Sequence, residues 1–471
     1  MKSVAVIGAG ITGLTAAFRL QQKNIPVTVY EASQRVGGVI QSIREDGFLA
    51  ECGPNTLLET SPKITELIRD LGLEDRKRYT DERATERFIV RRGKPIVMSD
   101  SKLGFFKTPL FSIGAKLRLF AEPFIRRAPA CCEESLEQFV LRRLGREFLD
   151  YAINPFVAGV YAGNPAKLSV KHAFPKLHAL EQKYGSLIIG QFLGARERKR
   201  SGEVSKQNAP KVSFDEGLQV LTEELRVKLG ECVQLNSPVT EITQTSGDWT
   251  VKYLSNGQEQ QREHEAVLFT SPIYKLGDVK LETAHKFDLS PLERIEYPPV
   301  ASIVMGFRRA DVEHACQGFG ALIPEVEKFN ILGVIFSSAL FPNRAPKDHV
   351  TITCYAGGSR NPDLARADRS TLRRLVLEDL KRLLGVRGEP VFENYFVYPK
   401  AIPQYQVGYG KNKALMDEIE AKAHGFFMAG HYRDGIALGD SILSGDHAAE
   451  KISTHLFEHH ISQKLNHIAT A

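Results

Sequence analysis

The stretch VAVIGAGITGLTAAFRL, residues 4–20, carries the strongest structural signal in the chain. Val4–Ile7 is a short apolar run of the kind that forms a buried strand in a parallel sheet, and a helical pattern follows it. Between the two, Gly8, Gly10 and Gly13 form a GxGxxG motif. The first glycine permits a tight turn, the second lets the backbone approach a pyrophosphate, and the third allows close helix–strand packing. Because the phosphates would meet the positive end of the helix, we predict a dinucleotide-binding unit.

A second apolar run, residues 27–30, ends at Glu31, whose carboxylate can accept hydrogen bonds from a ribose diol and would repel a ribose 2′-phosphate. A lone GxGxxG is weak, but here it follows a strand, opens a helix and precedes an acid at the expected distance. The stretch EASQRVGG, which begins at Glu31, resembles the extended E-x(n)-R-x-G-G motif of the flavin amine-oxidase-like superfamily. The resemblance implies FAD, with Arg35 at the diphosphate and Gly37 and Gly38 along the cofactor. The alternative for Arg35 is a solvated loop cation.

Two later segments complete a flavin-binding pattern. SPVTEI, residues 237–242, is predicted to form a short strand. In the superfamily such a strand places a valine backbone against adenine, here Val239, although an ordinary core valine explains the side chain equally well. AGHYRDGIALGDSILSGDHAAEKI, residues 429–452, resembles the segment whose helix N-terminus points at the isoalloxazine ring. Both chain ends are therefore expected to meet in one domain.

Four longer segments resemble one family within this superfamily, the protoporphyrinogen oxidases. They are ECGPNTLL at 51–58, NPFVAGVYAGNPAKLSV at 154–170, IPQYQVGYG at 402–410 and AGHYRDGIALGDSILSG at 429–445. The resemblance extends from Val4 to about Ile452, and its GVYAG and PQY segments are more specific than the glycine motifs. It implies an FAD enzyme that oxidises protoporphyrinogen IX to protoporphyrin IX, with oxygen as acceptor, in haem biosynthesis.

The resemblance also implies which residues bind FAD: the glycine loop, the acid with its following loop, a loop near residue 55, and the segment before the C-terminal helix. These residues are Gly8, Ala9, Gly10, Ile11, Thr12, Gly13, Glu31, Ala32, Arg35, Gly37, Gly38, Val39, Gly53, Pro54, Asn55, Thr56, Val239, His431, Ile436, Ala437 and Leu438. Some relatives carry arginine where this chain has Asn55, a departure that removes a charge at this position.

The stretch PFVAGVYAGNP, residues 155–165, has no charge and reads as neither an amphipathic helix nor an alternating strand. Its simplest interpretation is a buried glycine-rich turn. The resemblance implies instead that it lines a pocket for a flat macrocycle, with backbone carbonyls near Gly159 facing the pyrrole N–H groups. The residues implied to contact this substrate are Arg87, Gly159, Tyr161, Gly163, Ile335 and Tyr355.

Arg87 matches the arginine that the family pairs with a substrate propionate, and a guanidinium can bind a carboxylate bidentately. On local sequence alone, a surface cation is an equally good interpretation. Ile335 and Tyr355 match positions that sandwich the macrocycle, where the family often has leucine and phenylalanine; a core-strand interpretation is nearly as good. Tyr409 stands where relatives often have histidine. We assign no catalytic base and no metal site, because the flavin carries the chemistry.

Composition and charge exclude other classes of function. The net charge is +6 and the pI about 8.8, too weakly basic to indicate a nucleic-acid partner but compatible with anionic ligands or an anionic membrane surface. The six cysteines form no CxxC and no cysteine–histidine cluster of zinc spacing, so we predict reduced thiols in a cytoplasmic protein. No apolar run is long enough to span a bilayer, which leaves peripheral attachment to the cytoplasmic membrane open. A homodimer also stays open.

We predict an α/β fold with three parts. A discontinuous Rossmann-like FAD-binding domain comprises 1–80, 205–270 and 420–471, a helical insertion covers 100–200, and a mixed-sheet substrate-binding domain comprises 81–99 and 271–420. In the insertion, residues 101–127 combine phenylalanines with six basic residues and one acid. This composition indicates either interfacial membrane binding, where substrate would enter, or an amphipathic helical pair packed on the substrate domain. Residues 196–209 are charged, lack apolar spacing and are predicted to be flexible.

Three other functions stay open. Oxidation of coproporphyrinogen III to coproporphyrin III is the related reaction on a substrate with four propionates, and additional cations in the pocket would favour it. Another flavin oxidase of the superfamily, acting on amines or carotenoids, is the second. A non-enzymatic member that binds lipidated partners without a flavin is the third. The intact glycine motifs and the porphyrin-family segments argue against the last two.

Overall fold

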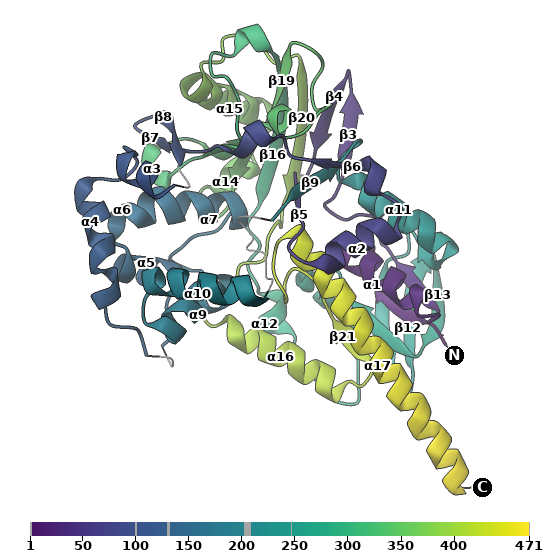
Figure 1. Ribbon diagram of the computed structural model, residues 1–471. Coiled ribbons are helices and arrows are strands. Elements are labelled where there is room, and N and C mark those ends of the chain that lie inside the picture. Colours follow the sequence, from purple (N-terminus) through teal and green to yellow (C-terminus); the bar gives the residue numbers. More distant parts are fainter. Residues whose placement is uncertain (1, 99–100, 130–131, 202–208, 246, 471) are drawn as a thin grey trace.

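The computed structural model describes residues 2–98, 101–129, 132–201, 209–245 and 247–470. These residues form a parallel sheet that contains the N-terminal strand, a larger mixed sheet, and a group of helices at one side of the molecule (Figure 1). The predicted α/β class, a Rossmann-like unit with a mixed sheet and a helical insertion, is confirmed. The boundaries between domains stay a prediction.

The five-stranded parallel sheet gathers strands from distant parts of the chain. In spatial order it contains β10 (Val233–Gln234), β2 (Val27–Tyr30), β1 (Val4–Ile7), β14 (Ala266–Phe269) and β21 (Phe426–Met428). All residues of β1, β2 and β14 are buried, as expected of apolar strands that are covered on both faces. Because β1 and β21 both pair with β14, strands from the two chain ends lie in one sheet.

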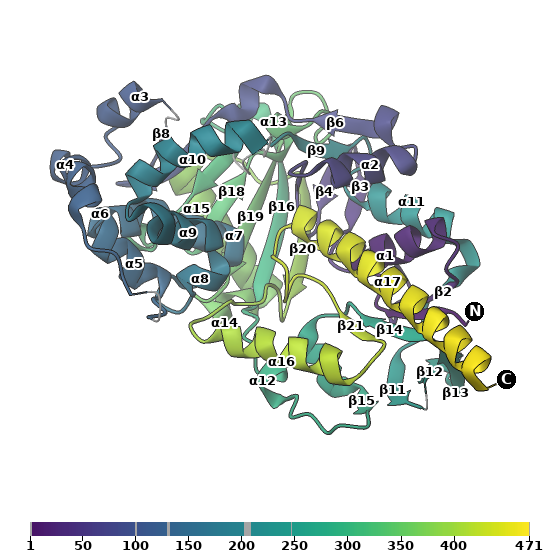
Figure 2. The same cartoon turned by 60° about the horizontal axis from the view of Figure 1, so that its bottom comes forward.

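Helices from the two chain ends also pack against each other. These are α1 (Ile11–Gln22) and α17 (Leu438–Thr470), which run side by side in Figures 1 and 2. The Thr12 hydroxyl donates a hydrogen bond to the Ser441 carbonyl at 3.0 Å. A Cβ on Gly445 would lie 2.3 Å from the Thr12 carbonyl oxygen, so only glycine permits this close approach. The first helix, with its glycine loop, is therefore held directly against the C-terminal helix.

Smaller sheets and helices complete this part of the described chain. One sheet has the order β13 (Gln258–His264), β12 (Trp249–Ser255), β11 (Val239–Gln244) and β15 (Lys280–Glu282). A hairpin joins β3 (Ser42–Glu45) to β4 (Phe48–Glu51), and a third sheet has the order β5 (Leu57–Leu58), β9 (Lys211–Phe214) and β6 (Lys77–Tyr79). The helices here are α2 (Pro62–Asp70) and α11 (Gln219–Leu229).

The larger sheet has seven strands and is antiparallel except between β17 and β7. Its order is β20 (Phe392–Tyr398), β16 (Val300–Arg308), β19 (His349–Gly357), β18 (Ile331–Ile335), β17 (Gly320–Leu322), β7 (Arg87–Arg91) and β8 (Lys94–Met98). One face packs against the apolar side of α15 (Arg369–Leu384) in a single core cluster. The other face is available to the rest of the molecule, and it carries the candidate site.

Shorter helices surround the two main sheets. The helical group contains α3 (Lys102–Lys107), α4 (Ile113–Ala121), α5 (Leu136–Arg143), α6 (Arg146–Phe148), α7 (Asn154–Tyr161), α8 (Val170–Ala173), α9 (Pro175–Tyr184) and α10 (Leu187–Ser201). Elsewhere lie α12 (Ser290–Glu293), α13 (Ser337–Leu340), α14 (Pro362–Ala365) and α16 (Tyr409–Lys422). None of the helices in the described ranges is both long and apolar enough to cross a bilayer.

Two stretches of the helical group differ from the sequence interpretation. The residues from Asn154 to Tyr161 form α7 rather than a turn, with Pro155 in the first helical turn, where its missing N–H costs nothing. The helix ends at Ala162, which adopts the left-handed conformation with a φ of +49°. Of the stretch 196–209, α10 continues to Ser201, and residues 202–208 lie outside the described ranges.

Candidate active site

The glycine loop has the geometry that the GxGxxG motif predicts. Gly8 has a φ of +106°, a backbone conformation that side chains disfavour. A Cβ on Gly13 would lie 2.1 Å from the Gly8 carbonyl oxygen, so glycine is required for α1 to follow β1 this closely. A Cβ on Gly10, by contrast, would meet no described atom within 4 Å. The loop thus leaves open space where a pyrophosphate is expected, and the helix that starts with the buried residues Ile11 and Thr12 points its N-terminus there.

Glu31 lies beside this loop at the end of β2. Its Oε2 accepts a hydrogen bond from the Ala9 backbone N–H at 2.8 Å, and its Oε1 accepts one from the Ser33 N–H at 2.9 Å. The Glu31 carbonyl accepts the Ser237 N–H at 2.8 Å, which brings the strand containing Val239 to the same end of the sheet. Ala32 is exposed next to Glu31. The predicted ribose and adenine ends of a dinucleotide site are therefore adjacent.

Arg35 has a definite partner set in its own loop. Its guanidinium donates to the carbonyls of Val36 and Ile40 at 3.1 Å each and to that of Gly38 at 2.6 Å. The Gly37 N–H donates to the Ala9 carbonyl at 2.8 Å, so this loop is tied to the first glycine loop. Arg35 is thus held by its own loop rather than freely solvated, and its diphosphate contact stays a prediction.

A second loop, residues 53–56, lies against the loop that contains Val39. A Cβ on Gly53 would lie 2.3 Å from the carbonyl oxygen of Val39, whose own side chain is 51% exposed. The Asn55 side-chain amide donates to the Tyr355 hydroxyl at 2.5 Å, and that hydroxyl donates to the Gly53 carbonyl at 3.3 Å. Burial raises the pKa of the Tyr355 hydroxyl, which keeps it protonated and able to donate. Pro54 and Thr56, on either side of Asn55, are half-buried.

The segment before α17 is held by tyrosines. Tyr405, from the PQY segment, donates its hydroxyl proton to the His431 carbonyl and accepts the Gly435 N–H at 3.1 Å. Burial lowers the pKa of His431 to about 4, so its imidazole is neutral, and its Nε2 has no partner in the described part of the chain. The Ala437 N–H donates to the Asp440 carboxylate at 3.3 Å. Ile436 and Leu438 are half-buried beside Ala437 at the start of α17, where a flavin ring is predicted to lie.

Three predicted substrate residues share one face of the seven-stranded sheet. Arg87 and Ile335 both pair directly with Gly320, and directly paired residues point to the same side. Ile335 pairs in turn with Thr353, and Tyr355 is two residues further along β19 on the same side. The register therefore places Arg87, Ile335 and Tyr355 on one surface, opposite the face that packs on α15. No carboxylate of a described residue lies within ion-pair distance of Arg87.

Helix α7 covers part of this face. Ala158 and Ala162 belong to a small apolar cluster with Tyr355 and Ile402, so the GVYAG and PQY segments meet at the sheet. Gly159 is exposed, and a Cβ there would lie 2.5 Å from Cδ2 of Leu322 in β17. A side chain at this position would have to displace the end of the Leu322 side chain. Its predicted contact with a macrocycle stays a prediction.

Tyr161 and Gly163 have packing partners within the protein. The Tyr161 hydroxyl donates to the Ala173 carbonyl at 2.8 Å, and the Tyr161 carbonyl accepts from Nε2 of Gln404 at 2.8 Å. A Cβ on Gly163 would lie 2.3 Å from Oε1 of the same glutamine. Both residues therefore anchor the end of α7 to α8 and to the PQY segment, and direct contact with a substrate stays a prediction.

The sequence did not indicate several residues whose side chains hold α7 in place. Gln404 was part of a recognised segment but had no assigned role, although a buried glutamine beside two tyrosines requires partners. Leu322 and Arg360 carried no local signal, because only the sheet register brings them to α7, and Asn154 belonged to a recognised segment but had no assigned role.

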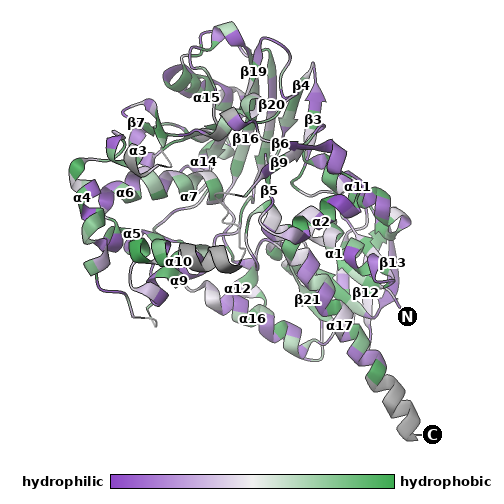
Figure 3. Ribbon diagram, viewed as in Figure 1, coloured by the Kyte–Doolittle hydropathy of each residue, from purple (hydrophilic) through white to green (hydrophobic). Residues whose placement is uncertain are grey.

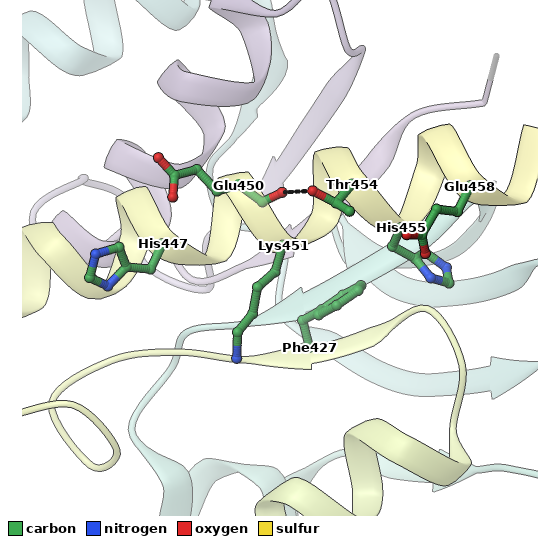
Figure 4. Close-up of a pocket in the computed structure, with 7 residues that line it drawn as sticks. All are labelled: Phe427, His447, Glu450, Lys451, Thr454, His455 and Glu458. Carbon is green, nitrogen blue, oxygen red and sulfur yellow. Dashed lines mark hydrogen bonds between the residues drawn. The ribbon is translucent and has the colours of Figure 1, made fainter.

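A separate hollow of about 570 Å³ lies along the outer side of α17. Its lining comes from α17 and β21: Phe427, His447, Glu450, Lys451, Thr454, His455 and Glu458 (Figure 4). Thr454 donates its hydroxyl proton to the Glu450 carbonyl, an ordinary contact within a helix. The hollow contains none of the predicted site residues, so we assign neither cofactor nor substrate to it.

Comparisons with known proteins agree with the predicted family. The sequence profile described as flavin containing amine oxidoreductase matches residues 11–453. Protoporphyrinogen oxidase 2 of Arabidopsis thaliana is 35% identical over 480 residues, covering 97% of this chain and 94% of the relative. Coproporphyrinogen III oxidase of Bacillus subtilis is 29% identical over 472 residues, covering 97% and 99%. A crystal structure of a proposed protoporphyrinogen oxidase from Exiguobacterium sp. 255-15 superposes with a TM-score of 0.79 at 25% identity, covering 97% and 99%.

Proposed function

The chain belongs to the flavin-containing amine oxidoreductase family as an FAD-dependent oxidase, and on that premise we propose that it oxidises protoporphyrinogen IX to protoporphyrin IX in haem biosynthesis. The plant relatives named protoporphyrinogen oxidase match nearly the whole chain, which supports this substrate class. Oxygen is the proposed acceptor.

One observation of the site carries the proposal. The Asn55–Tyr355 hydrogen bond joins the loop beside the expected cofactor to the sheet face that holds Arg87 and Ile335. A substrate on this face would therefore lie next to the cofactor loop, which is the arrangement that transfer between the two requires. The apolar cluster of α7 with Tyr355 gives the same region an uncharged lining suited to a macrocycle.

Bound FAD supplies the acceptor for a hydride from a bridging carbon of the porphyrinogen. The chain itself binds and orients. Arg87, unpaired in the described structure, would bind a propionate, while Ile335 and Tyr355 would hold the faces of the ring. Tyr355 keeps its proton and His431 is neutral, so neither brings a buried charge to the apolar site. A pyrrole proton would leave through water or backbone carbonyls.

Coproporphyrinogen III is the second candidate substrate. The Bacillus subtilis and Staphylococcus aureus relatives named coproporphyrinogen III oxidase cover almost the whole chain, at 29% identity each. Their identity is lower than the 35% of the Arabidopsis relative, which favours protoporphyrinogen for this chain.

We further propose that the helical group rests on an anionic membrane surface. Ile113, Leu117 and Phe120 of α4 and Phe124 after it are 77%, 61%, 61% and 89% exposed, an unusual run of large apolar side chains in water. Apolar residues recur along α4 at the edge of the molecule in Figure 3. Arg118, Arg126 and Arg127 are exposed in the same segment and would meet anionic headgroups.

A buried ion pair fixes this apolar segment to the rest of the helical group. Glu122, between Phe120 and Phe124, pairs with Arg143 of α5 at 2.9 Å, and both side chains are fully buried. Glu122 also accepts the backbone N–H of Leu187, at the start of α10, at 3.0 Å. On α10 itself, Phe192 and Leu193 are 58% and 43% exposed. The exposed apolar side chains are thus carried by a rigid frame rather than by a loose loop.

The test of the catalytic proposal is anaerobic mixing of the yellow protein with protoporphyrinogen and, in parallel, coproporphyrinogen. We expect protoporphyrinogen to bleach the flavin absorbance faster, and porphyrin fluorescence to appear when oxygen is admitted. Faster bleaching by coproporphyrinogen would select the second candidate. A yellow protein that neither substrate bleaches would remove porphyrinogen oxidation altogether.

A further inference from the structure

The turn that follows β19 contacts one end of α7. The Ser359 backbone N–H donates to the Ala162 carbonyl at 2.7 Å. Gly358 has a φ of +65°, and a Cβ there would lie 2.7 Å from the same carbonyl oxygen. The turn therefore brings its backbone against Ala162, the residue that caps the C-terminal end of the helix.

The same turn reaches the other end of α7 through a side chain. Nη2 of Arg360 donates to Oδ1 of Asn154, the first residue of the helix, at 3.1 Å. The same Oδ1 accepts the Glu325 backbone N–H at 3.0 Å, and Nδ2 of Asn154 donates to the Glu325 carboxylate at 3.2 Å. The Asn154 amide thus bridges an arginine that follows β19 and a glutamate that follows β17.

The Arg360 guanidinium is largely buried and lacks an ion-pair partner among the described residues. Burial lowers the pKa of its guanidinium, and the nearby Glu325 carboxylate opposes that shift. In the described ranges no carboxylate lies within ion-pair distance, and its buried Nη1 has no partner. The bond to Asn154 is partly buried, where a hydrogen bond is stronger than one in full contact with water, and it restrains the N-terminal end of α7.

We propose that Arg360 is a positioning residue for porphyrinogen oxidation, which acts through Asn154 to set where α7 lies on the sheet face. The inference rests on the proposed function, because α7 matters to catalysis only as a wall of the macrocycle site. Helix α7 has eight residues, a length of about 12 Å. The turn after β19 therefore contacts both ends of α7. Loss of the Arg360–Asn154 hydrogen bond would free the N-terminal end of the helix and shift Gly159 and Ala158 relative to Tyr355.

The test compares Arg360→Met with Arg366→Met in the FAD-loaded protein. Arg366 lies six residues further on, is 58% exposed and pairs, among the described residues, with Asp363. Arg360→Met should slow flavin bleaching at saturating porphyrinogen by about tenfold, because a small misplacement of reacting groups is costly, with KM changed much less. FAD content and reduction by dithionite should stay at wild-type levels, and Arg366→Met should match wild type throughout.

Two further variants separate positioning from a general loss of structure. Arg360→Lys keeps one charged donor within reach of Asn154 and should recover most of the rate even if Arg360→Met folds poorly. If Arg360 acts through Asn154, the Arg360→Met, Asn154→Ala double variant should be no slower than the slower single variant.

Three results would overturn the inference while leaving the proposed function intact. One is a wild-type bleaching rate in Arg360→Met, and another is strictly multiplicative slowing in the double variant. The third is a KM that rises strongly for coproporphyrinogen but little for protoporphyrinogen, which would make Arg360 a direct carboxylate ligand. A wild-type protein that no porphyrinogen bleaches would instead remove the proposed function, and the inference with it.

Discussion

The side-chain amide of Asn55 and the hydroxyl of Tyr355 form a 2.5 Å hydrogen bond between the loop beside the cofactor site and the seven-stranded sheet. The family resemblance implies that some relatives have arginine at the first position and that the family often has phenylalanine at the second. In this chain the two side chains are hydrogen-bonded to each other: the Asn55 amide donates to the Tyr355 hydroxyl, and the hydroxyl donates to the Gly53 carbonyl. The pair fixes the Tyr355 ring where a macrocycle face is expected.

Replacing Tyr355 by phenylalanine should test that contact. Tyr355→Phe keeps the ring but removes the nearer of the two acceptors of the buried Asn55 amide and leaves only the Gly53 carbonyl at 3.4 Å, at a cost of about 1–3 kcal/mol in the free energy of unfolding. Urea unfolding of the flavin-loaded protein measures this loss, and the rate of flavin bleaching by porphyrinogen should fall as well. Tyr395→Phe is the control, because its hydroxyl bonds to Glu393 on β20, away from the site. Equal behaviour of the two variants would show that the Asn55 contact has no special role.

Gly10 should be essential for retaining FAD but not for folding. A side chain there meets no described atom within 4 Å, so Gly10→Val can fold, while its methyl groups occupy the space expected for the pyrophosphate. The ratio of flavin to protein absorbance should fall close to zero with the far-ultraviolet circular dichroism unchanged. Gly114→Ala, in the open surroundings of α4, should retain flavin. A fully yellow Gly10→Val protein would contradict the assignment of the loop.

Arg87 should contribute to substrate binding alone. Its guanidinium has no ion pair with a described residue, and its position on the Ile335 and Tyr355 face suits a propionate. Arg87→Ala should raise KM for protoporphyrinogen roughly 10-fold or more, the loss of a charge-assisted hydrogen bond, and leave FAD content unchanged. Arg387→Ala, an exposed arginine paired with Glu313, is the matched control. Normal KM in Arg87→Ala would remove this residue from the site.

His264 should make the protein less stable in mild acid. Its imidazole is buried between the Ser3 and Tyr30 hydroxyls at 2.9 Å each, and burial lowers its pKa from 6.5 to about 4. The folded state therefore binds fewer protons than the unfolded state between these values. Its stabilising contribution is fully present above pH 6.5 and is lost as the pH falls towards 4, by about 3 kcal/mol in total.

Urea unfolding midpoints measured from pH 7 to pH 4 test whether the stability falls with pH as predicted. His264→Gln, which cannot titrate, should show a shallower decline than wild type, whereas the exposed His285→Gln should follow the wild-type curve. Parallel curves for wild type and His264→Gln would mean that other groups, such as His431, account for the acid sensitivity.

The exposed side chains of α4 should control membrane binding. Leu117→Asp combined with Phe120→Asp places two carboxylates where the proposal requires apolar contact with lipid. Cosedimentation with vesicles that contain anionic phospholipid should fall at least tenfold, while flavin bleaching by dispersed substrate persists. Phe457→Asp removes another exposed phenylalanine, on α17, and should bind vesicles normally. Loss of binding in that control alone would place the membrane contact on α17.

Local sequence was sufficient to predict the elements whose geometry depends on consecutive residues. The glycine spacing after an apolar run predicts the turn between β1 and α1, because Gly8 adopts a positive φ there and a side chain on Gly13 would collide with the Gly8 carbonyl. The start of α15 also depends on neighbouring residues, because the Asp368 side chain caps the helix by accepting the Thr371 N–H. Local sequence did not predict α7, because the uncharged stretch 155–165 with its two glycines lacks the pattern of an amphipathic helix.

The contacts that shape the site could not be read in this way. Asn55 and Tyr355 lie 300 positions apart, and Arg360 reaches Asn154 across 206 positions. Such pairs depend on strand register and on how α7 packs against the sheet, and neither is encoded near either partner. The nucleotide-binding loop thus follows from the chain read in order, whereas the alignment of Arg87, Ile335 and Tyr355 on one face, and the packing roles of Tyr161 and Gly163, arise only once the strands are paired.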